Sequence, residues 1–202
     1  PEDYVIVDIA GFHVYLVQED EIVWQARAQV GKPYRNTPVF RDSMRYLEFN
    51  PTWTVPPTIL REDILPRLEH GPDYLAKRNV RILDRNGKPV DISTIDWPSV
   101  AAGNFPYILR QEPGPNNALG RVKFMFPNKH AVYIHDTPSK SLFAHNERTF
   151  SSGCIRVERP FELAEVLLDD PERWDQQGIQ QLLDSRRTQR VNLKEPLPVL
   201  IL

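Results

Sequence analysis

Apolar and polar residues alternate over short segments at both ends of the chain, with the period of two that is typical of half-buried β-strands. In the first thirty residues these segments are 4–9, 12–17 and 22–31, and turn signals separate them. Alternating runs joined by short turns predict a β-meander. Further strands are predicted over residues 44–49, 107–110, 122–126, 131–135, 191–193 and 197–202.

The middle of the chain has a different pattern. Three prolines within residues 50–57 exclude a central strand and predict an extended segment at a sheet edge. From there the apolar spacing becomes helical, with Thr58 as a plausible N-cap and Pro66 shortening the first helix. A short helix over residues 73–77 and a strand over residues 80–83 are predicted next. We therefore expect residues 58–106 to form an inserted, α-rich capping subdomain, a lid over a cleft.

Helical spacing returns after Pro160, where apolar residues recur on one face as far as Leu168. A second helix is predicted over residues 172–187, after the break at Pro171. The expected fold class is mainly β with α, in which the insertion and the C-terminal helices are added to a β-rich core. The length of 202 residues suits a single domain, residues 1–202.

Composition and charge exclude several classes of protein. The net charge is −2, so the chain offers no basic stripe for nucleic acid. A transmembrane helix needs about 20 consecutive apolar residues, and no such run is present. The 19 prolines exceed the roughly ten expected from average usage and suggest short elements joined by stiff loops. Because the sequence starts at Pro1 and stops within an apolar run, we expect targeting information and flanking domains outside it.

The chain has one cysteine, Cys154, which excludes an internal disulfide. Its five histidines show no tight ligand spacing. A zinc site built from His130, His135, His145 and Cys154 is disfavoured, because these spacings match none of the usual patterns. We therefore expect neither a metal nor a cofactor.

The most informative pair of residues is His135, at the end of a predicted strand, and Cys154, nineteen residues later and directly after Gly153. A cysteine attacks carbonyls as its thiolate and needs a nearby base, which histidine can supply. Gly153 permits a tight turn that could leave the backbone N–H groups of Gly153 and Cys154 free to stabilise an oxyanion.

The alternative reading of Cys154 is a buried, inert residue, which is what most free cysteines are. Its neighbours argue against that reading. Ser151, Ser152 and Arg156 are poor core lining, and a cation beside a thiol lowers the thiol pKa. His145, in the loop between the two candidates, is expected to be exposed and not catalytic.

Residues 134–138, Ile-His-Asp-Thr-Pro, together with residues 151–157, Ser-Ser-Gly-Cys-Ile-Arg-Val, resemble the L,D-transpeptidase catalytic domain, the YkuD-like family. The resemblance is to its large periplasmic Gram-negative branch, which carries a capping subdomain and whose fold is β-sandwich-like. It extends to residues 50–57, 102–106, 111–120 and 123–127. One departure is visible: Ser152 stands where many members have a second histidine.

The resemblance implies roles for individual residues. Cys154 would be the nucleophile, and His135 the general base and later acid. Gly153, Ser152 and Tyr133 would support the oxyanion and the active site, and Arg156, Trp53, Ser151 and Asn116 would bind substrate. Plainer readings stay open for several of these residues. Arg156 could be a solvated surface arginine, Tyr133 and Trp53 structural aromatics, and Asn116 an ordinary turn residue. Whether Asp136 orients His135 is also open, because its side chain should point to the opposite strand face.

The implied activity is a transferase of peptidoglycan biosynthesis and cell wall biogenesis. It would form 3→3 cross-links between tetrapeptide stems through a cysteine thioester, release D-alanine and be inhibited by carbapenems. Such an enzyme contributes to cell shape, lies in the periplasm and would be membrane-associated through a segment outside this sequence. Two alternatives are a cysteine L,D-carboxypeptidase or amidase acting on the same stems, and an inactive peptidoglycan-binding module.

Overall fold

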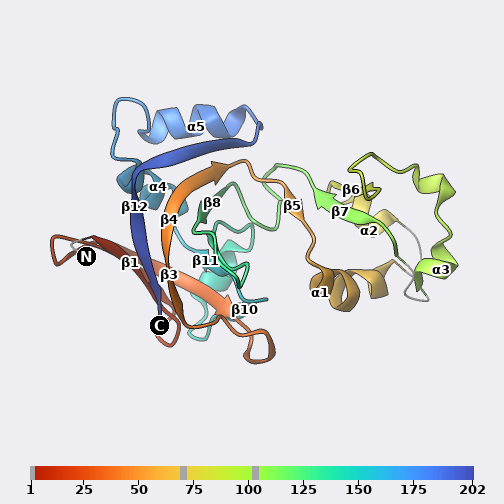
Figure 1. Ribbon diagram of the computed structural model, residues 1–202, viewed down its shortest axis with the longest axis horizontal. Coiled ribbons are helices and arrows are strands. Elements are labelled where there is room, and N and C mark those ends of the chain that lie inside the picture. Colours follow the sequence, from red (N-terminus) through yellow and green to blue (C-terminus); the bar gives the residue numbers. More distant parts are fainter. Residues whose placement is uncertain (1–2, 69–71, 102–104) are drawn as a thin grey trace. The chain divides into compact units, whose positions relative to one another are not determined.

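The computed structural model describes residues 3–68, 72–101 and 105–202, which divide into two compact units (Figure 1). The first unit comprises Pro1–Pro51 and Leu119–Leu202, and the second comprises Thr52–Ala118. The second unit is thus inserted in the sequence of the first, with wider bounds than the predicted insertion. Residues 102–104, part of the segment 102–106 that resembles the family, lie outside the described residues.

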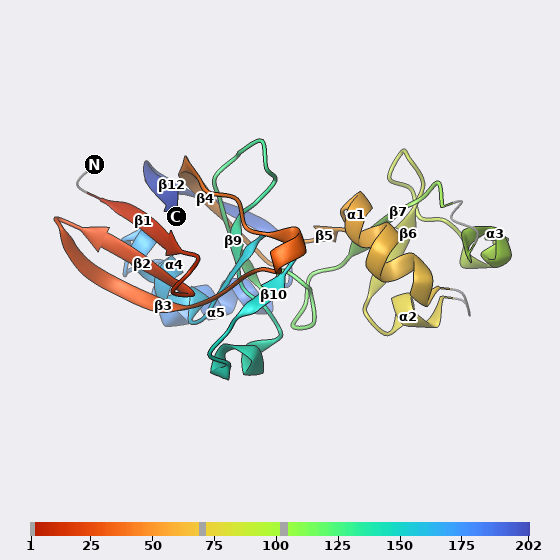
Figure 2. The same cartoon turned by 90° about the horizontal axis from the view of Figure 1, so that it is seen from below.

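One nine-stranded sheet forms the frame of the first unit, in the order β10-β3-β11-β9-β8-β4-β12-β1-β2. Its strands are β1 (Tyr4–Asp8), β2 (His13–Gln18), β3 (Glu21–Gly31), β4 (Phe40–Phe49), β8 (Val122–Met125), β9 (Ile134–His135), β10 (Thr149–Ser151), β11 (Ile155–Val157) and β12 (Gln189–Ile201). Because β2 also pairs with β3, the sheet curls and closes on itself (Figure 2). The resemblance led us to expect a sandwich; the structure has this single curled sheet.

The predicted meander is confirmed, since β1, β2 and β3 pair antiparallel in sequence order. The two final strands predicted over residues 191–193 and 197–202 are instead one strand, β12, whose register against β4 shifts between Asn192 and Leu197. The predicted strand over residues 107–110 is β7 (Ile108–Gln111), and it belongs to the second unit instead of the main sheet. The alternating pattern predicts that a segment is a strand, but it does not predict which strand pairs with it.

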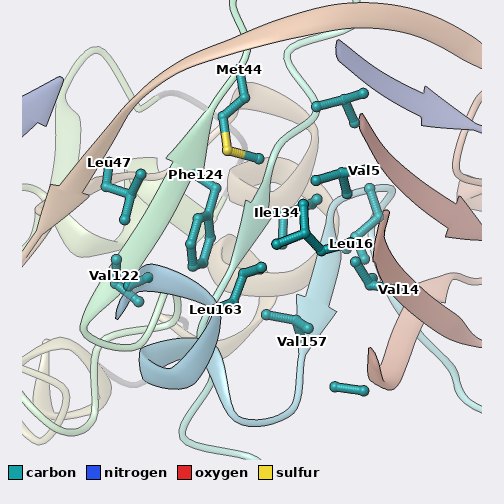
Figure 3. Packing of buried hydrophobic residues seen from close by; sticks show 14 of the residues in the cluster. Val5, Val14, Leu16, Met44, Leu47, Val122, Phe124, Ile134, Val157 and Leu163 are labelled. Carbon is teal, nitrogen blue, oxygen red and sulfur yellow. The ribbon is translucent and has the colours of Figure 1, made fainter. Parts of the chain in front are cut away.

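The core of the first unit fills the inside of the curled sheet (Figure 3). Alternate strand residues such as Val5, Leu16, Phe124 and Ile134 are fully buried there. Two helices, α4 (Pro160–Leu168) and α5 (Gln176–Asp184), contribute Leu163, Ala164 and other apolar side chains to it. Asp175 is the N-cap of helix α5, and its carboxylate accepts the Gly178 N–H over 2.7 Å. The helix is therefore shorter than the predicted residues 172–187.

The second unit has its own small core and a three-stranded sheet in the order β5 (Trp53–Thr54), β7, β6 (Val80–Leu83). As predicted, residues 50–57 supply an edge strand. The first helical run begins with α1 (Pro57–Ile59) and continues through a π-helical turn, Leu60–Ile64, and a 3-10 turn, Leu65–Arg67. Its N-cap is Pro56, so Thr58 lies inside the first turn and the predicted cap is wrong.

Only short helices complete the described part of the second unit, namely α2 (Asp73–Ala76), α3 (Trp97–Ala101) and a 3-10 turn, Ile92–Thr94. The first unit adds 3-10 turns at Pro33–Arg35 and Lys140–Ala144. The mainly β character of the chain is therefore plain, whereas the α-rich capping subdomain stays a prediction. No helix within the described ranges is long and apolar enough to cross a membrane.

Candidate active site

The candidate residues gather where β9 and β11 run side by side. The two strands are parallel, with Ile134 opposite Ile155 and His135 opposite Arg156. Ile134 and Ile155 are fully buried in the core, so strand alternation places His135 and Arg156 on the other face of the sheet. Cys154 lies two residues before Arg156 and shares this face. We call it the site face, defined by Tyr133, His135, Cys154 and Arg156.

Cys154 sits at the end of a turn that depends on Gly153. The φ angle of Gly153 is +119°, a conformation that residues with a side chain rarely adopt. Ser151 closes the turn from inside: its hydroxyl donates to Cys154 O over 2.5 Å and accepts the Gly153 N–H over 3.1 Å. The Gly153 N–H is therefore engaged, not free as expected. Ser151 is also buried, and its hydroxyl forms hydrogen bonds within the turn, whereas the sequence predicted that it contacts substrate.

A second loop, 116 residues earlier in the chain, buttresses this turn. The buried Thr37 hydroxyl donates to Gly153 O over 2.8 Å and accepts the Gly31 N–H over 2.9 Å. Arg35 Nη1 donates to the exposed Ser152 hydroxyl over 2.9 Å. A side chain at Gly31 would collide with Arg35 O, 2.3 Å from where its Cβ would stand. Sequence reasoning missed this loop, because only the pairing of β10 with β3 brings it to the nucleophile.

The Cys154 thiol is a partly buried group among cations. Its Sγ donates to Ala131 O over 3.9 Å, and in the part of the chain that the structure describes it does not hydrogen-bond to His135. Burial raises the thiol pKa, and this outweighs the lowering by a Tyr133 backbone hydrogen bond and by the charges of Arg156 and Lys123. The expected effect of a neighbouring cation is therefore present but smaller than that of burial. The Cys154 side chain is therefore a neutral thiol in the folded protein.

His135 is a buried, neutral imidazole. Burial lowers its pKa to about 3, and the Arg156 charge adds to this, while hydrogen bonds to the backbone of Asp136 and Leu119 oppose it. Its Nδ1 lies against Asp136 O, and because a carbonyl only accepts, this contact favours the tautomer with the proton on Nδ1. Nε2 then has the lone pair that a general base needs.

Asp136 orients His135 through its backbone carbonyl. Its carboxylate accepts the Arg121 N–H over 2.9 Å and forms an ion pair with Lys140, away from the imidazole. Gly120 makes this arrangement possible, since a Cβ there would stand 2.4 Å from Asp136 side-chain atoms. The sequence left open whether Asp136 orients His135. In the structure the Asp136 carbonyl, not its carboxylate, contacts the imidazole.

Two further side chains complete the site face. Lys123 lies opposite His135 in the register of β8 and β9, and its ammonium is 3.0 Å from Glu48. The Tyr133 ring packs edge-on against His135 with centroids 5.9 Å apart, and burial raises the Tyr133 pKa. Tyr133 therefore lies beside His135, as its place in the strand predicted. Lys123 was missed, although its position in an alternating strand was the available signal.

The remaining candidates lie elsewhere. Trp53 and Asn116 belong to the second unit, where Asn116 O accepts from Gln111 Nε2 over 3.0 Å, and their substrate-binding roles stay predictions. His145 and His130 pack on Phe150 and Phe40, with ring centroids 5.4 Å and 4.8 Å apart. Over the described ranges no three His, Cys, Asp or Glu side chains are grouped as metal ligands.

A thiol, a neutral imidazole and a guanidinium on one sheet face are typical of cysteine-dependent acyl transfer. Comparison with known proteins identifies the family. The family model of the YkuD L,D-transpeptidase catalytic domain matches residues 2–179. The chain belongs to this family.

A curated relative from Haemophilus influenzae, named "Putative L,D-transpeptidase", is 34% identical over 197 residues, which are 98% of this chain and 40% of the relative. The chain thus spans two fifths of the length of that protein. Solved structures with a similar trace include the Enterococcus faecium L,D-transpeptidase catalytic domain acylated by ertapenem, at 13% identity and a TM-score of 0.44, covering all of this chain and 97% of that one. L,D-transpeptidase 3 from Mycobacterium tuberculosis matches at 13% identity and a TM-score of 0.44, covering 61% of that chain.

Proposed function

We propose that the chain is an L,D-transpeptidase that forms 3→3 cross-links in peptidoglycan through a thioester on Cys154. The observation that carries the proposal is the site face itself, where Cys154 follows a glycine in a positive-φ turn and shares one sheet face with His135 and Arg156. Membership of the family supports the same reaction class.

In the first half-reaction, the sulfur of Cys154 attacks the carbonyl carbon between the third residue of a tetrapeptide stem and its terminal D-alanine. His135 Nε2 takes the thiol proton and passes it to the leaving amine. The carbon–nitrogen bond breaks, free D-alanine departs, and the stem remains as a thioester. Because the resting thiol and imidazole are both neutral, the proton moves when substrate is in place.

In the second half-reaction, a side-chain amine of another stem attacks the thioester carbonyl and gives its proton to His135. The thiolate leaves and is reprotonated, so one amide has replaced another and no external energy source is needed. Arg156, half-buried beside the nucleophile, would hold a carboxylate of the donor, since a guanidinium forks onto carboxylates. The Cys154 N–H remains the candidate oxyanion donor.

The proposal extends to the setting of the enzyme. A transferase acting on peptidoglycan stems would work in the periplasm, take part in cell wall biogenesis and help to set cell shape. Carbapenems would acylate Cys154, because a thiolate that opens a strained lactam forms the same kind of thioester. Residues 58–106 would favour the amine over water as acceptor by capping the site.

Intact-mass measurement tests the proposal. The parent protein should gain the mass of one carbapenem, and Cys154→Ala should gain none, while His145→Gln serves as a control that keeps the adduct. Incubation with a tetrapeptide donor and an amine acceptor should then give cross-linked dimers. Cleaved stems alone would establish a hydrolase instead, and a parent protein whose thiol stays inert would establish an inactive binding module.

A further inference from the structure

Gln29, in β3, is a fully buried amide on the strand that runs beside β11. In the register of the sheet it lies opposite Arg156, which in turn lies opposite His135. A buried side-chain amide is costly unless its polar atoms are hydrogen-bonded. The two bonds that it makes therefore indicate what the residue does.

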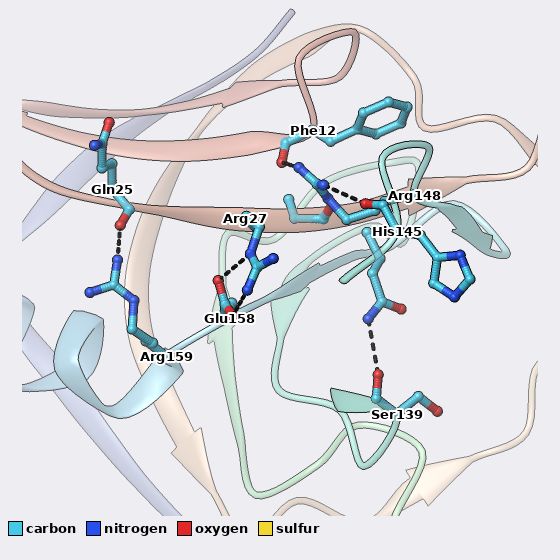
Figure 4. Close-up of polar contacts among 10 residues, drawn as sticks. Phe12, Gln25, Arg27, Ser139, His145, Arg148, Glu158 and Arg159 are labelled. Carbon is cyan, nitrogen blue, oxygen red and sulfur yellow. Dashed lines mark hydrogen bonds and ion pairs between the residues drawn. The ribbon is translucent and has the colours of Figure 1, made fainter. Parts of the chain in front are cut away.

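The two bonds run to different parts of the site. Gln29 Oε1 accepts from Arg156 Nη1 over 3.2 Å, and Gln29 Nε2 donates to Ser139 O over 3.2 Å. Figure 4 shows the second of these bonds, ending on Ser139. Ser139 belongs to the segment that directly follows His135. One amide thus joins the guanidinium beside the nucleophile to the loop that leaves the base.

Only a neutral amide satisfies both neighbours. A guanidinium can only donate and a carbonyl can only accept, so the bridging side chain must offer one acceptor and one donor. Glutamate has the same shape but would lack the donor for Ser139 O, and it would neutralise Arg156. Methionine has a similar length but neither group. The chemistry of the two partners therefore selects glutamine over its nearest isosteres.

Arg156 keeps its charge in this arrangement. Within the described ranges no carboxylate forms an ion pair with it, and its buried Nε has no hydrogen-bond acceptor. The groups that surround Cys154 on this face are Arg156, Lys123, Tyr133 and His135. Lys123 is already paired with Glu48 at 3.0 Å, so Arg156 is the cation that remains available to an anion.

We propose that Gln29 is a positioning residue, which holds the Arg156 guanidinium beside Cys154 and leaves it charged to recognise a carboxylate of the donor peptide. The proposal rests on the proposed function for the identity of that peptide. It predicts that replacing Gln29 raises KM for the donor and lowers selectivity for the carboxylate, and that kcat changes much less.

The test compares Gln29→Glu with Gln25→Glu. Gln25 is exposed on the same strand, four residues earlier and roughly 13 Å away, so the second variant adds the same charge at a distance. Donor peptides with a free carboxylate and with that carboxylate amidated are compared as substrates. Gln29→Glu should raise KM for the free acid about tenfold or more with kcat nearly unchanged, and should bring the selectivity between the two donors close to one. Gln25→Glu should retain parental values.

Alkylation of Cys154 by iodoacetamide supplies a readout that needs no transpeptidase activity. A carboxylate at position 29 cancels the Arg156 charge, so the pH at which alkylation reaches half its maximal rate should rise by about 0.5 or more. Gln29→Met, which removes both bonds and adds no charge, should raise KM and leave that pH near the parental value. If Gln29→Glu does not fold, the KM of Gln29→Met tests the proposal by itself.

Parental selectivity and a parental alkylation profile in Gln29→Glu would overturn the proposal, as would a parental KM in Gln29→Met. If the parent protein makes no cross-linked product, the proposed function fails, and the alkylation profile alone then decides whether Gln29 controls the charge at Arg156.

Discussion

Alternating residues of strands β9 and β11 form two faces with opposite properties. On the core face Ile134, Ile155 and Val157 are fully buried among apolar neighbours. On the site face His135 is almost as buried, at 3% exposed, yet its neighbours are Tyr133, Arg156 and the backbone of Asp136.

The difference lies in what each face loses when a residue changes. A core residue contributes volume and removes apolar surface from water, so its loss weakens the fold. A site residue contributes a charge, a lone pair or a fixed geometry, so its loss should alter chemistry more than stability. Four experiments test this difference between the core face and the site face.

The largest effect is expected from His135→Gln. It should lower kcat about 10²–10⁴-fold, because the variant has no base for the thiol proton. The free energy of unfolding at pH 7 should change by only about 1–2 kcal/mol, since the amide can still donate to Asp136 O. Kinetics and urea unfolding of the same preparation measure both. If the variant lost stability in proportion to activity, the proposed difference between the core face and the site face would be wrong.

The reverse behaviour is expected one residue earlier. Ile134→Ala should lower the free energy of unfolding by about 2–5 kcal/mol, because it leaves a cavity in the core. Ile134→Val, the graded control, should cost about 0.5–1.5 kcal/mol. The folded fraction of either variant should keep kcat within a few-fold of the parent. A large fall in kcat for Ile134→Val would mean that core packing also sets the geometry of the site.

Gly153→Ala separates backbone strain from packing. The added Cβ would be 3.6 Å from its nearest neighbour, Asn36 O, so there is room for it, but the φ of +119° is unfavourable for alanine. We expect a loss of about 1–3 kcal/mol in stability, together with a fall in alkylation rate and activity. Gly87→Ala, at φ +79° in a turn of the second unit, is the matched control and should affect stability alone. Unchanged reactivity in Gly153→Ala would contradict the role given to this turn.

The fourth experiment follows the pH dependence of stability. An unfolded histidine takes up a proton below about pH 6.5, whereas His135 in the folded protein stays neutral down to about pH 3. The unfolded state therefore binds more protons in this window, and stability should fall as pH drops through it, by at most about 1.4 kcal/mol per pH unit. His135→Gln should remove this part of the slope and the exposed His145→Gln should keep it, as followed by urea unfolding. Equal slopes in both variants would show that His135 is not buried neutral.

Much of the fold follows from local patterns. The β1–β3 meander, the edge strand at Trp53 and helix α4 were all predicted, because alternation, proline positions and a 3.6-residue period are properties of neighbouring residues. Errors arose where partners are distant. Strand β7 was assigned to the wrong sheet, and β12 was divided in two because the register shift between Asn192 and Leu197 depends on β4.

The candidate site divides in the same way. The sequence alone indicated which residues can do chemistry: one cysteine after a glycine, an arginine two positions after that cysteine, and a histidine at a strand end. The chemistry of a thiol, an imidazole or a guanidinium follows from the residue type, whatever fold the chain adopts. Three features became visible in the folded chain: Asp136 contacts His135 through its carbonyl, burial keeps the thiol and imidazole neutral, and Gln29 bridges Arg156 to Ser139. The Gln29 contacts join residues 110 and 127 positions apart, and burial depends on the packing of the whole sheet, so local sequence does not encode either.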